Sequence, residues 1–440
     1  MSTLKNIWEF LGVSSAAGIA GVVLFFAMLF GLNRLPKKKY SFAVRVLMGT
    51  GAGTVFGLVL SALSGVLNMN SWLRLVAHGY VCLFASVVIP MIFLASVRLV
   101  LRTPAEKKVS KLTKWKKWVN TLMMVISATV AVVMGIVFRI GAMPGSDMVV
   151  FDSNAGMTLT DQIRTLIPSG LGVDLIATNV VGVFVFGIYV GIAARRMSGK
   201  YMDTVKPVFD LVEAAFSVGT SVCKTIIAYK PMGAAAIMAM LTAEHGVAVV
   251  LMILKMLVVL TAGAAIMLVI QLIFCALSGV GPAAFLHAGR GAMIKALKTR
   301  SGSDCLPDAQ KALAEGLGLN REITDVVSAY AISSGMQGCG ALFPATAAVF
   351  AAGICGITLT PATAVALVLV IMLMSYGITD IPGTATVGEF SAVMGCGMQS
   401  ALPGLGAMIA IDPIGDVPRT LINVTGCMAN AIIVERRVRE

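Results

Sequence analysis

The sequence has few charged residues for its length. The 34 basic and 21 acidic residues make up 12% of the 440 positions, whereas 58% of the residues are apolar. This charged share is about half of what a soluble domain usually has. So few charges cannot cover a surface that faces water, and the chain is therefore predicted to be solvated by lipid. This excludes a soluble enzyme, a disordered scaffold and a secreted disulfide module.

Residues that bind metals or build disulfide frameworks are scarce or scattered. The three histidines, His78, His245 and His287, are too dispersed to form a metal cluster. None of the eight cysteines forms a C-x-x-C pair, and most lie in apolar segments, where a thiol acts as a small hydrophobe. The sequence also lacks H-E-x-x-H and G-x-S-x-G motifs. We therefore expect no metal site and no enzymatic activity.

The 13 excess positive charges lie in short clusters between apolar runs. This is the positive-inside pattern of a polytopic membrane protein, so the lipid bilayer is an expected partner and nucleic acid is not. If the cluster at 34–45 is cytoplasmic, alternation places the amino terminus outside and the carboxyl terminus in the cytoplasm. The other clusters lie at 102–117, 195–200, 290–300 and 436–439.

Apolar segments long enough to span a bilayer, which takes about 20 residues in a helix, recur along the chain. The predicted spans are 12–33, 43–66, 76–101, 118–142, 175–195, 205–243, 247–279, 324–353 and 402–434. The broken stretch 362–401 must enter and leave on the same side if the carboxyl terminus is cytoplasmic. Topology therefore predicts a re-entrant segment there.

Two segments are too polar or too broken for ordinary spans. Residues 300–307 read R-S-G-S-D-C-L-P, and residues 375–386 read S-Y-G-I-T-D-I-P-G-T-A-T. Such backbone at membrane depth is tolerated only where it is buried or lines a cavity. Two half-helix hairpins that meet at the midplane, as in secondary transporters, would satisfy this requirement. A cytoplasmic loop for the first segment and a kinked helix for the second are the alternatives.

The last apolar segment carries five polar residues on one face. The spacing of Asp412, Asp416, Arg419, Asn423 and Cys427 places them within a sector of about 60° on a helix. Each charge near the bilayer centre costs ~2.5–3.5 kcal/mol, so this stripe must face protein, water or a ligand. A cation beside an anion suits a zwitterion such as an amino acid. An Asp416–Arg419 pair that only ties helices together is the alternative.

A glycine-rich stretch lies within the 54 uncharged positions of 326–379. Residues 333–344 read S-S-G-M-Q-G-C-G-A-L-F-P. They predict either an unwound turn whose carbonyl groups could ligate an ion, or small residues that allow tight helix packing.

The chain resembles the dicarboxylate/amino acid:cation symporter family, which has the glutamate transporter-like fold. The resemblance is carried by the two broken segments, the glycine-rich stretch and the last apolar segment. The resemblance covers roughly residues 41–435. The sequence D-V-P-R-T-L-I-N-V-T-G at 416–426 is similar to the family's D-M-G-R-T-x-x-N-V-x-G. Within the family, Q-G-C-G-A-L-F-P-A at 337–345 looks most like the Q-N-G-C-A-G-L-Y-P-A motif of bacterial L-cystine uptake transporters. The additional N-terminal helix also fits that branch.

The resemblance implies an all-α polytopic membrane protein with eight core transmembrane helices, two re-entrant helical hairpins and an additional N-terminal transmembrane helix. It implies a homotrimer in which a mobile transport domain carries substrate past a scaffold like an elevator, with the second hairpin as a gate. The implied segments are 1–40 (additional helix), 41–103 and 143–246 (scaffold), 104–142 and 247–440 (transport domain), about 286–319 and 362–401 (hairpins) and 402–434 (substrate helix).

The resemblance also implies a binding site for a small amino acid. Arg419 would bind a carboxylate or distal polar group, and Asp416 would take the α-ammonium group. The other implied substrate-binding residues are Ser301, Gly302, Ser303, Cys339, Ile381, Gly383, Ala385, Thr420 and Asn423. L-Cystine, with two zwitterionic ends, could reach both Asp416 and Arg419. Ion-coupled symport of glutamate, aspartate or a C4-dicarboxylate is the alternative, and an anion channel is a further one.

The sequence departs from the family pattern where sodium binds. Gln337 and Cys427 replace two sodium-binding aspartates, and Na⁺ prefers hard oxygen ligands. Coupling to one Na⁺ or to H⁺, with no other cofactor, is therefore expected. A buried Asp380 or Asp412 would be the proton acceptor. The candidate cation-coupling residues are Ser333, Gln337, Ser375, Tyr376, Ile378, Asp380 and Asp412.

Overall fold

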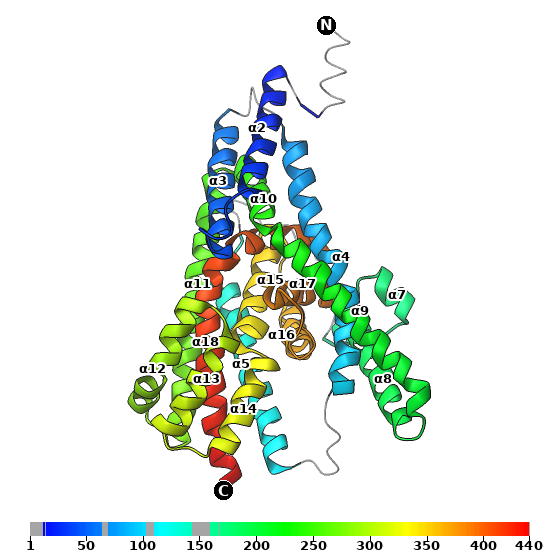
Figure 1. The fold of residues 1–440 in the computed structure, drawn as a ribbon. Helices are drawn as coiled ribbons and strands as arrows, with labels where there is room; N and C mark the ends of the chain where they lie inside the picture. The colour runs from blue at the N-terminus through cyan, green and yellow to red at the C-terminus, as the bar shows by residue number, and fades with distance from the viewer. Residues whose placement is uncertain are drawn as a thin grey trace.

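The computed structural model describes residues 12–13, 15–63, 69–102, 110–142, 159–165 and 167–439. The described residues form helices and their connections, with no strand among them (Figure 1). The first half holds α2 (Ala16–Asn33), α3 (Phe42–Ala62), α4 (Asn70–Arg102), α5 (Lys111–Val137), α6 (Leu159–Thr165), α7 (Leu171–Ile176), α8 (Val180–Ser198), α9 (Met202–Ala228) and α10 (Lys230–His245). The second holds α11 (Val247–Leu277), α12 (Pro282–Thr299), α13 (Gly302–Lys311), η1 (Ala312–Gly316), α14 (Arg321–Ser333), η2 (Gln337–Leu342), α15 (Phe343–Ile354), α16 (Pro361–Ser375), α17 (Thr384–Gly395), η3 (Gln399–Gly404) and α18 (Leu405–Arg439).

Nine segments of the described chain are long and apolar enough to cross a membrane. They comprise α2 and eight further segments, which matches the predicted additional helix and eight core spans. Large apolar side chains on the outer helices, such as Leu211, Val258 and Leu277, are more than 60% exposed. In a membrane such side chains face lipid, so a polytopic membrane fold explains an apolar surface that water would not tolerate.

Two predicted segment boundaries were wrong for local reasons. The single span predicted at 205–243 is two helices, α9 and α10, because Pro231 has no N–H to continue the helix and instead occupies the first turn of α10. The span predicted from 118 begins at Lys111, where Ser110 caps the helix by accepting a hydrogen bond from the Thr113 N–H group. The lysines at 111–117 therefore lie on helical turns. Residues 103–109 and 143–158, which hold predicted domain boundaries, lie outside the described residues.

Both predicted re-entrant segments are helical hairpins. The first consists of α12 and α13, joined at Arg300, which has a left-handed backbone (φ 54°), and at Ser301, which caps α13. An ion pair between Lys295 and Asp308, 2.7 Å long, joins its two arms. The second consists of α16 and α17, and Gly383 supplies the left-handed conformation (φ 78°) from which α17 begins. The alternatives of a loop and a kinked helix are thus wrong.

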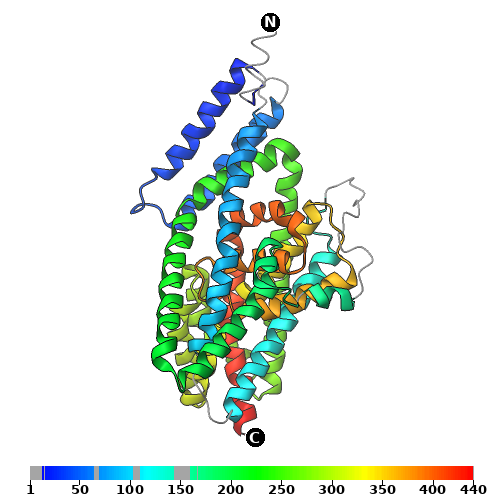
Figure 2. The ribbon, with the colours of Figure 1, turned by 90° about the vertical axis from the view of Figure 1, so that its right-hand side faces the viewer.

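The helices pack around α18, which runs down the molecule to the carboxyl terminus (Figure 1). The hairpin arms α12 and α13 and the helices α5, α11 and α14 contact α18, and so do α3, α4 and α10; α3 and α4 in turn pack against α10. The basic first turns of α5, the α8–α9 turn and the last turn of α18 lie toward the end that holds the carboxyl terminus (Figures 1 and 2). These three basic clusters therefore share one side of the protein.

A stripe of glycines brings α3 and α10 into close contact. Gly49, Gly53 and Gly57 recur every fourth residue, and a Cβ on each would lie 2.1–2.3 Å from a backbone carbonyl oxygen of α10. Small residues at this spacing let helices approach closely in a membrane. Since the obstructing atoms belong to the backbone, no side-chain rotation could accommodate a larger residue.

We therefore expect Gly53→Ala to lower the stability of the protein by about 1–3 kcal/mol, because the added methyl overpacks the contact with Ala235. Gly51→Ala is the matched control, since a Cβ at Gly51 meets nothing within 4 Å. Thermal unfolding of the detergent-purified variants measures the difference. Equal melting temperatures for the two variants would contradict the proposed packing.

Candidate substrate site

Arg419 is the centre of the polar stripe on α18. Its side chain is only 5% exposed, and its Nε donates to the Asp416 Oδ1 at 3.0 Å. Its Nη2 lies 2.5 Å from the Asp412 Oδ1 in an ion pair that is not aligned as a hydrogen bond. The guanidinium group also lies 4.4 Å from the centre of the Phe343 ring. Its Nη1 is buried without a hydrogen-bond partner among the described residues.

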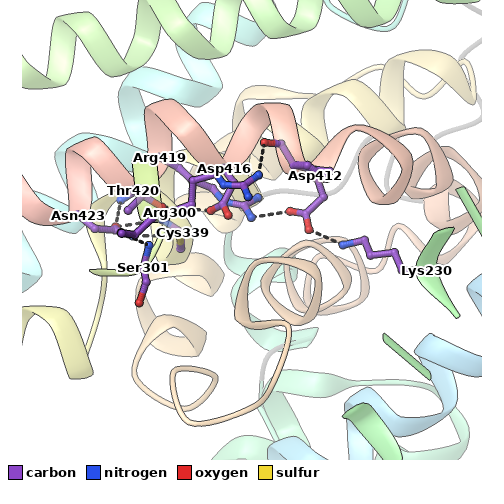
Figure 3. Close-up of polar contacts among 12 residues, drawn as sticks. Lys230, Arg300, Ser301, Cys339, Asp412, Asp416, Arg419, Thr420 and Asn423 are labelled. Carbon is purple, nitrogen blue, oxygen red and sulfur yellow. Dashed lines mark hydrogen bonds and ion pairs between the residues drawn. The ribbon is translucent and has the colours of Figure 1, made fainter. Parts of the chain in front are cut away.

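Lys230 extends this ion pairing from another helix. It is the first residue of α10, its side chain is 6% exposed, and its Nζ pairs with the Asp412 Oδ2. Thr420 adds a hydrogen bond to the Asp416 Oδ1 at 3.1 Å. Figure 3 shows the row running from Lys230 through Asp412, Arg419 and Asp416 towards Thr420 and Asn423. The predicted stripe therefore faces protein, as the cost of intramembrane charge requires.

The glycine-rich stretch contains an unwound turn, and the helix η2 that follows the turn is hydrogen-bonded to α18. The α14 helix ends at Ser333, Ser334 and Met336 are extended, and Gly335 is left-handed (φ 85°). The Asn423 Oδ1 then accepts hydrogen bonds from the backbone N–H groups of Gly338 (2.8 Å) and Cys339 (3.2 Å). A Cβ at Gly338 would lie 2.0 Å from the backbone carbonyl oxygen of Arg419. The stretch therefore contains an unwound turn at 334–336 and also packs tightly on α18 at Gly338. That its carbonyl groups ligate an ion stays a prediction.

The tip of the first hairpin also reaches α18. The Arg300 Nη1 donates to the backbone carbonyl of Pro413 at 3.4 Å, and Figure 3 shows Ser301 beside Cys339 and Asn423. The hydroxyl groups of Ser301 and Ser303 lie 3.1 Å apart, and Gly302 lies next to Ile332. The structure therefore brings the predicted residues of the first hairpin, of the unwound turn and of α18 together.

The tip of the second hairpin lies against other helices. A Cβ at Gly383 would lie 3.2 Å from Phe84 of α4 and from Ile227 of α9. Ile381 and Ala385 are buried on either side of this turn. The role of these three residues in closing over a substrate stays a prediction.

A network of neutral amides surrounds Gln337, one of the two positions at which the family resemblance implies a sodium-binding aspartate. The Gln337 Oε1 accepts from Gln271 (2.8 Å), and the Gln337 Nε2 donates to Asn430 (3.1 Å), which in turn donates to the Asn120 Oδ1 (2.9 Å). The Asn120 Nδ2 donates to the carbonyl oxygens of Ser334 (2.6 Å) and Gly335 (3.3 Å). Amide N–H groups thus engage carbonyl oxygens that could otherwise face a cation.

The role of the remaining cation-coupling candidates stays a prediction, and the structure gives them the following hydrogen bonds. The Ser375 hydroxyl donates to the sulfur of Met124 at 3.7 Å, and the Tyr376 hydroxyl lies 2.5 Å from that of Thr121. The carbonyl of Ile378 accepts the N–H of Ile381 at 3.0 Å. Ser333 is exposed, and its hydroxyl donates to the carbonyl of Ala329 in its own helix.

The expectation of a buried Asp380 was wrong. Its side chain is 60% exposed, and it forms a 3.0 Å ion pair with Arg98 at the end of α4. Asp412 is largely buried, as expected, but it is paired with both Lys230 and Arg419.

Sequence reasoning missed two charged residues near this site. These residues are Lys230, which begins α10, and Glu389 of α17. Each is a lone ionisable residue within an apolar stretch, which is the signal that marks functional sites in membranes.

A family model described as the sodium:dicarboxylate symporter family matches residues 42–437. The chain belongs to this family. The symporter is also similar to proteins named L-cystine uptake protein TcyP. It is 28% identical to that of Shouchella clausii, over 95% of this chain and 93% of that protein. It is 25% identical to that of Bacillus cereus strain ATCC 10987 (93% and 92%) and 23% identical to that of Bacillus licheniformis (96% and 95%).

We expect Lys230→Met to destabilise the symporter, because it leaves Asp412 and Asp416 with one buried cation between them. Breaking a fully buried ion pair costs ~3–5 kcal/mol, and the cost here should be smaller because 20% of the Asp412 side chain is exposed. Adding Asp412→Asn should recover part of the loss by restoring charge balance. Thermal unfolding in a double-mutant cycle measures this coupling.

Lys311→Met is the matched control, since the Lys311–Glu315 pair is 70% and 64% exposed and should matter little. Additive effects of Lys230→Met and Asp412→Asn would show that the two residues are not coupled.

Proposed function

We propose that this symporter is a secondary active importer of an amino acid, with L-cystine as its substrate. The observation that carries this proposal is the buried Arg419, flanked by two aspartates and with one guanidinium nitrogen free of a hydrogen-bond partner among the described residues. The names of the relatives, L-cystine uptake protein, support the choice of amino acid.

The site offers complementary groups for the two poles of such a solute. The free Nη1 of Arg419 can donate to a carboxylate, while Asp416 can accept from an ammonium group. Entry of a zwitterion would exchange the Arg419–Asp416 hydrogen bond for two bonds to the ligand without changing the net charge. Cys339 lies beside this position, with its sulfur 3.0 Å from the Asn423 Nδ2. Its polarizable thiol would contact a bound solute.

We further propose the arrangement that the family resemblance implies. The helices around α18 form a transport domain that moves like an elevator past a scaffold built on α3, α4 and α10, and the second hairpin acts as the gate. The protein lies in the bacterial plasma membrane as a homotrimer. Its basic end, which holds the carboxyl terminus, faces the cytoplasm because positive clusters are retained on that side.

Coupling is proposed to use one Na⁺ or H⁺ rather than several sodium ions. The neutral Gln271–Gln337–Asn430–Asn120 network supports this, because it offers amide donors where sodium would need anionic oxygen. The anion-channel alternative receives no support from a polar stripe whose charges are paired internally.

Arg419→Lys should lower the apparent affinity for L-cystine by roughly 10- to 100-fold, because a charged hydrogen bond is worth about 1.5–3 kcal/mol and lysine cannot reproduce the planar fork. Uptake of labelled L-cystine into proteoliposomes, with unlabelled cystine, aspartate and succinate as competitors, measures this. Arg321→Lys at an exposed position is the control. Unchanged uptake by Arg419→Lys would refute the role of Arg419, and stronger competition by aspartate or succinate would favour the dicarboxylate alternative.

Uptake by the unmodified protein should rise at most linearly with external Na⁺, or should follow a proton gradient alone. Separate Na⁺ and H⁺ gradients across proteoliposomes test this directly. A steep, sigmoidal dependence on Na⁺ would require several bound sodium ions and would refute the proposed coupling.

A further inference from the structure

Glu389 is a buried acid without a partner. It lies on α17, the second arm of the gate hairpin, and its exposed fraction is 0%. Neither of its two carboxylate oxygens has a hydrogen-bond partner among the described residues. A carboxylate with neither a donor nor a counterion in contact is very costly in such an interior, whereas the neutral acid is far less so.

The other acids of this region are already paired. Asp416 is bonded to Arg419 and Thr420, and Asp412 is paired with Arg419 and Lys230. Asp380, on the same hairpin, is exposed and paired with Arg98. Each of these three aspartates therefore has a cation in contact. Glu389 is the acid in this region whose carboxyl oxygens have no hydrogen-bond partner among the described residues.

The charge balance of the neighbouring site points the same way. The groups that act on Glu389 electrostatically are Asp412 and Arg419 of α18 and Lys230 of α10. Tyr80 of α4 interacts with Asp412, and its hydroxyl donates to the carbonyl of Ile226. The two cations Lys230 and Arg419 balance the two anions Asp412 and Asp416. An ionised Glu389 would therefore leave the buried group with one uncompensated negative charge.

Two helices that contact α17, α4 and α8, carry arginines, and α4 also carries His78, but none of these groups is among those that act on Glu389. Its neighbour Phe390 stacks on Phe84 of α4, with ring centres 5.8 Å apart, and Gly388 lies against Pro344 and Ile378. The helices α15 and α16 that pack against α17 carry no charged residue. Glu389 can therefore exchange a proton with water only when α17 moves away from this packing.

We propose that Glu389 is the proton-carrying residue of this symporter and that the second hairpin can pack against α18 only when Glu389 holds a proton. This inference rests on the proposed function and adds the identity of the coupling ion and its site. The carboxylate takes up H⁺ while α17 is exposed to one side of the membrane. The neutral acid is buried as the hairpin closes, and the proton leaves when α17 is exposed to the other side.

Glu389→Gln tests the proposal, because the amide resembles the neutral acid in size but cannot release a proton. L-Cystine uptake by the unmodified protein should rise when the external pH is lower than the internal pH. In Glu389→Gln this stimulation should vanish, while exchange of internal for external cystine persists. Glu389→Asp should retain the stimulation, and Glu315→Gln, an exposed change of the same kind, should behave like the unmodified protein.

A second measurement does not depend on the substrate. Infrared spectra of the purified protein should contain the carbonyl band of a protonated carboxylic acid at neutral pH, and the band should be absent in Glu389→Gln. Proton-gradient stimulation that is equal in the unmodified protein and Glu389→Gln, or absent from both, would overturn the proposal, as would a missing band. If cystine is not transported at all, the proposed function fails, and the infrared band alone decides the protonation of Glu389.

Discussion

The arrangement of the site depends on one constraint, which is that charges inside a membrane protein must be neutralised where they lie. Arg419 is paired with Asp412 and Asp416, and Lys230 pairs with Asp412 as well. This pairing fixes the side of α18 that faces the protein and brings α10 against it. It also positions Asn423, one turn beyond Arg419, where its side chain binds the backbone of Gly338 and Cys339 at the start of η2, directly after the unwound turn. The ion pairs and the turn therefore form a single structural unit.

The parts of the site that share one helix could be predicted from the sequence. Periodicity alone placed Asp412, Asp416, Arg419 and Asn423 on one face, and the structure buries that face. The hairpins were predictable too, because glycine and proline at membrane depth leave few alternatives. The family resemblance supplied the number of spans, and the match over residues 42–437 confirms the membership.

The contacts that could not be predicted join residues far apart in the sequence. Lys230 pairs with Asp412 across 182 positions, and Arg98 draws Asp380 to the surface across 282. No local sequence pattern encodes such pairings, so the sequence does not show that Asp380 is exposed whereas Glu389 is buried. The replacement of acids by Gln337 and Cys427 was visible in the sequence. The sequence does not show that Gln337 joins a hydrogen-bonded network with Gln271, Asn430 and Asn120, because these three residues come from three other helices.

The position of Lys230 on α10 has an electrical consequence. The three other charged groups, Asp412, Asp416 and Arg419, lie on α18 and sum to one negative charge without it. If α18 moves relative to α10, this buried group of charges is neutral only while the lysine accompanies it. Otherwise it carries one elementary charge through the transmembrane field, which is worth about 2.3 kcal/mol for a full crossing at 100 mV. A lysine on the neighbouring helix thereby decides whether voltage acts on the moving part.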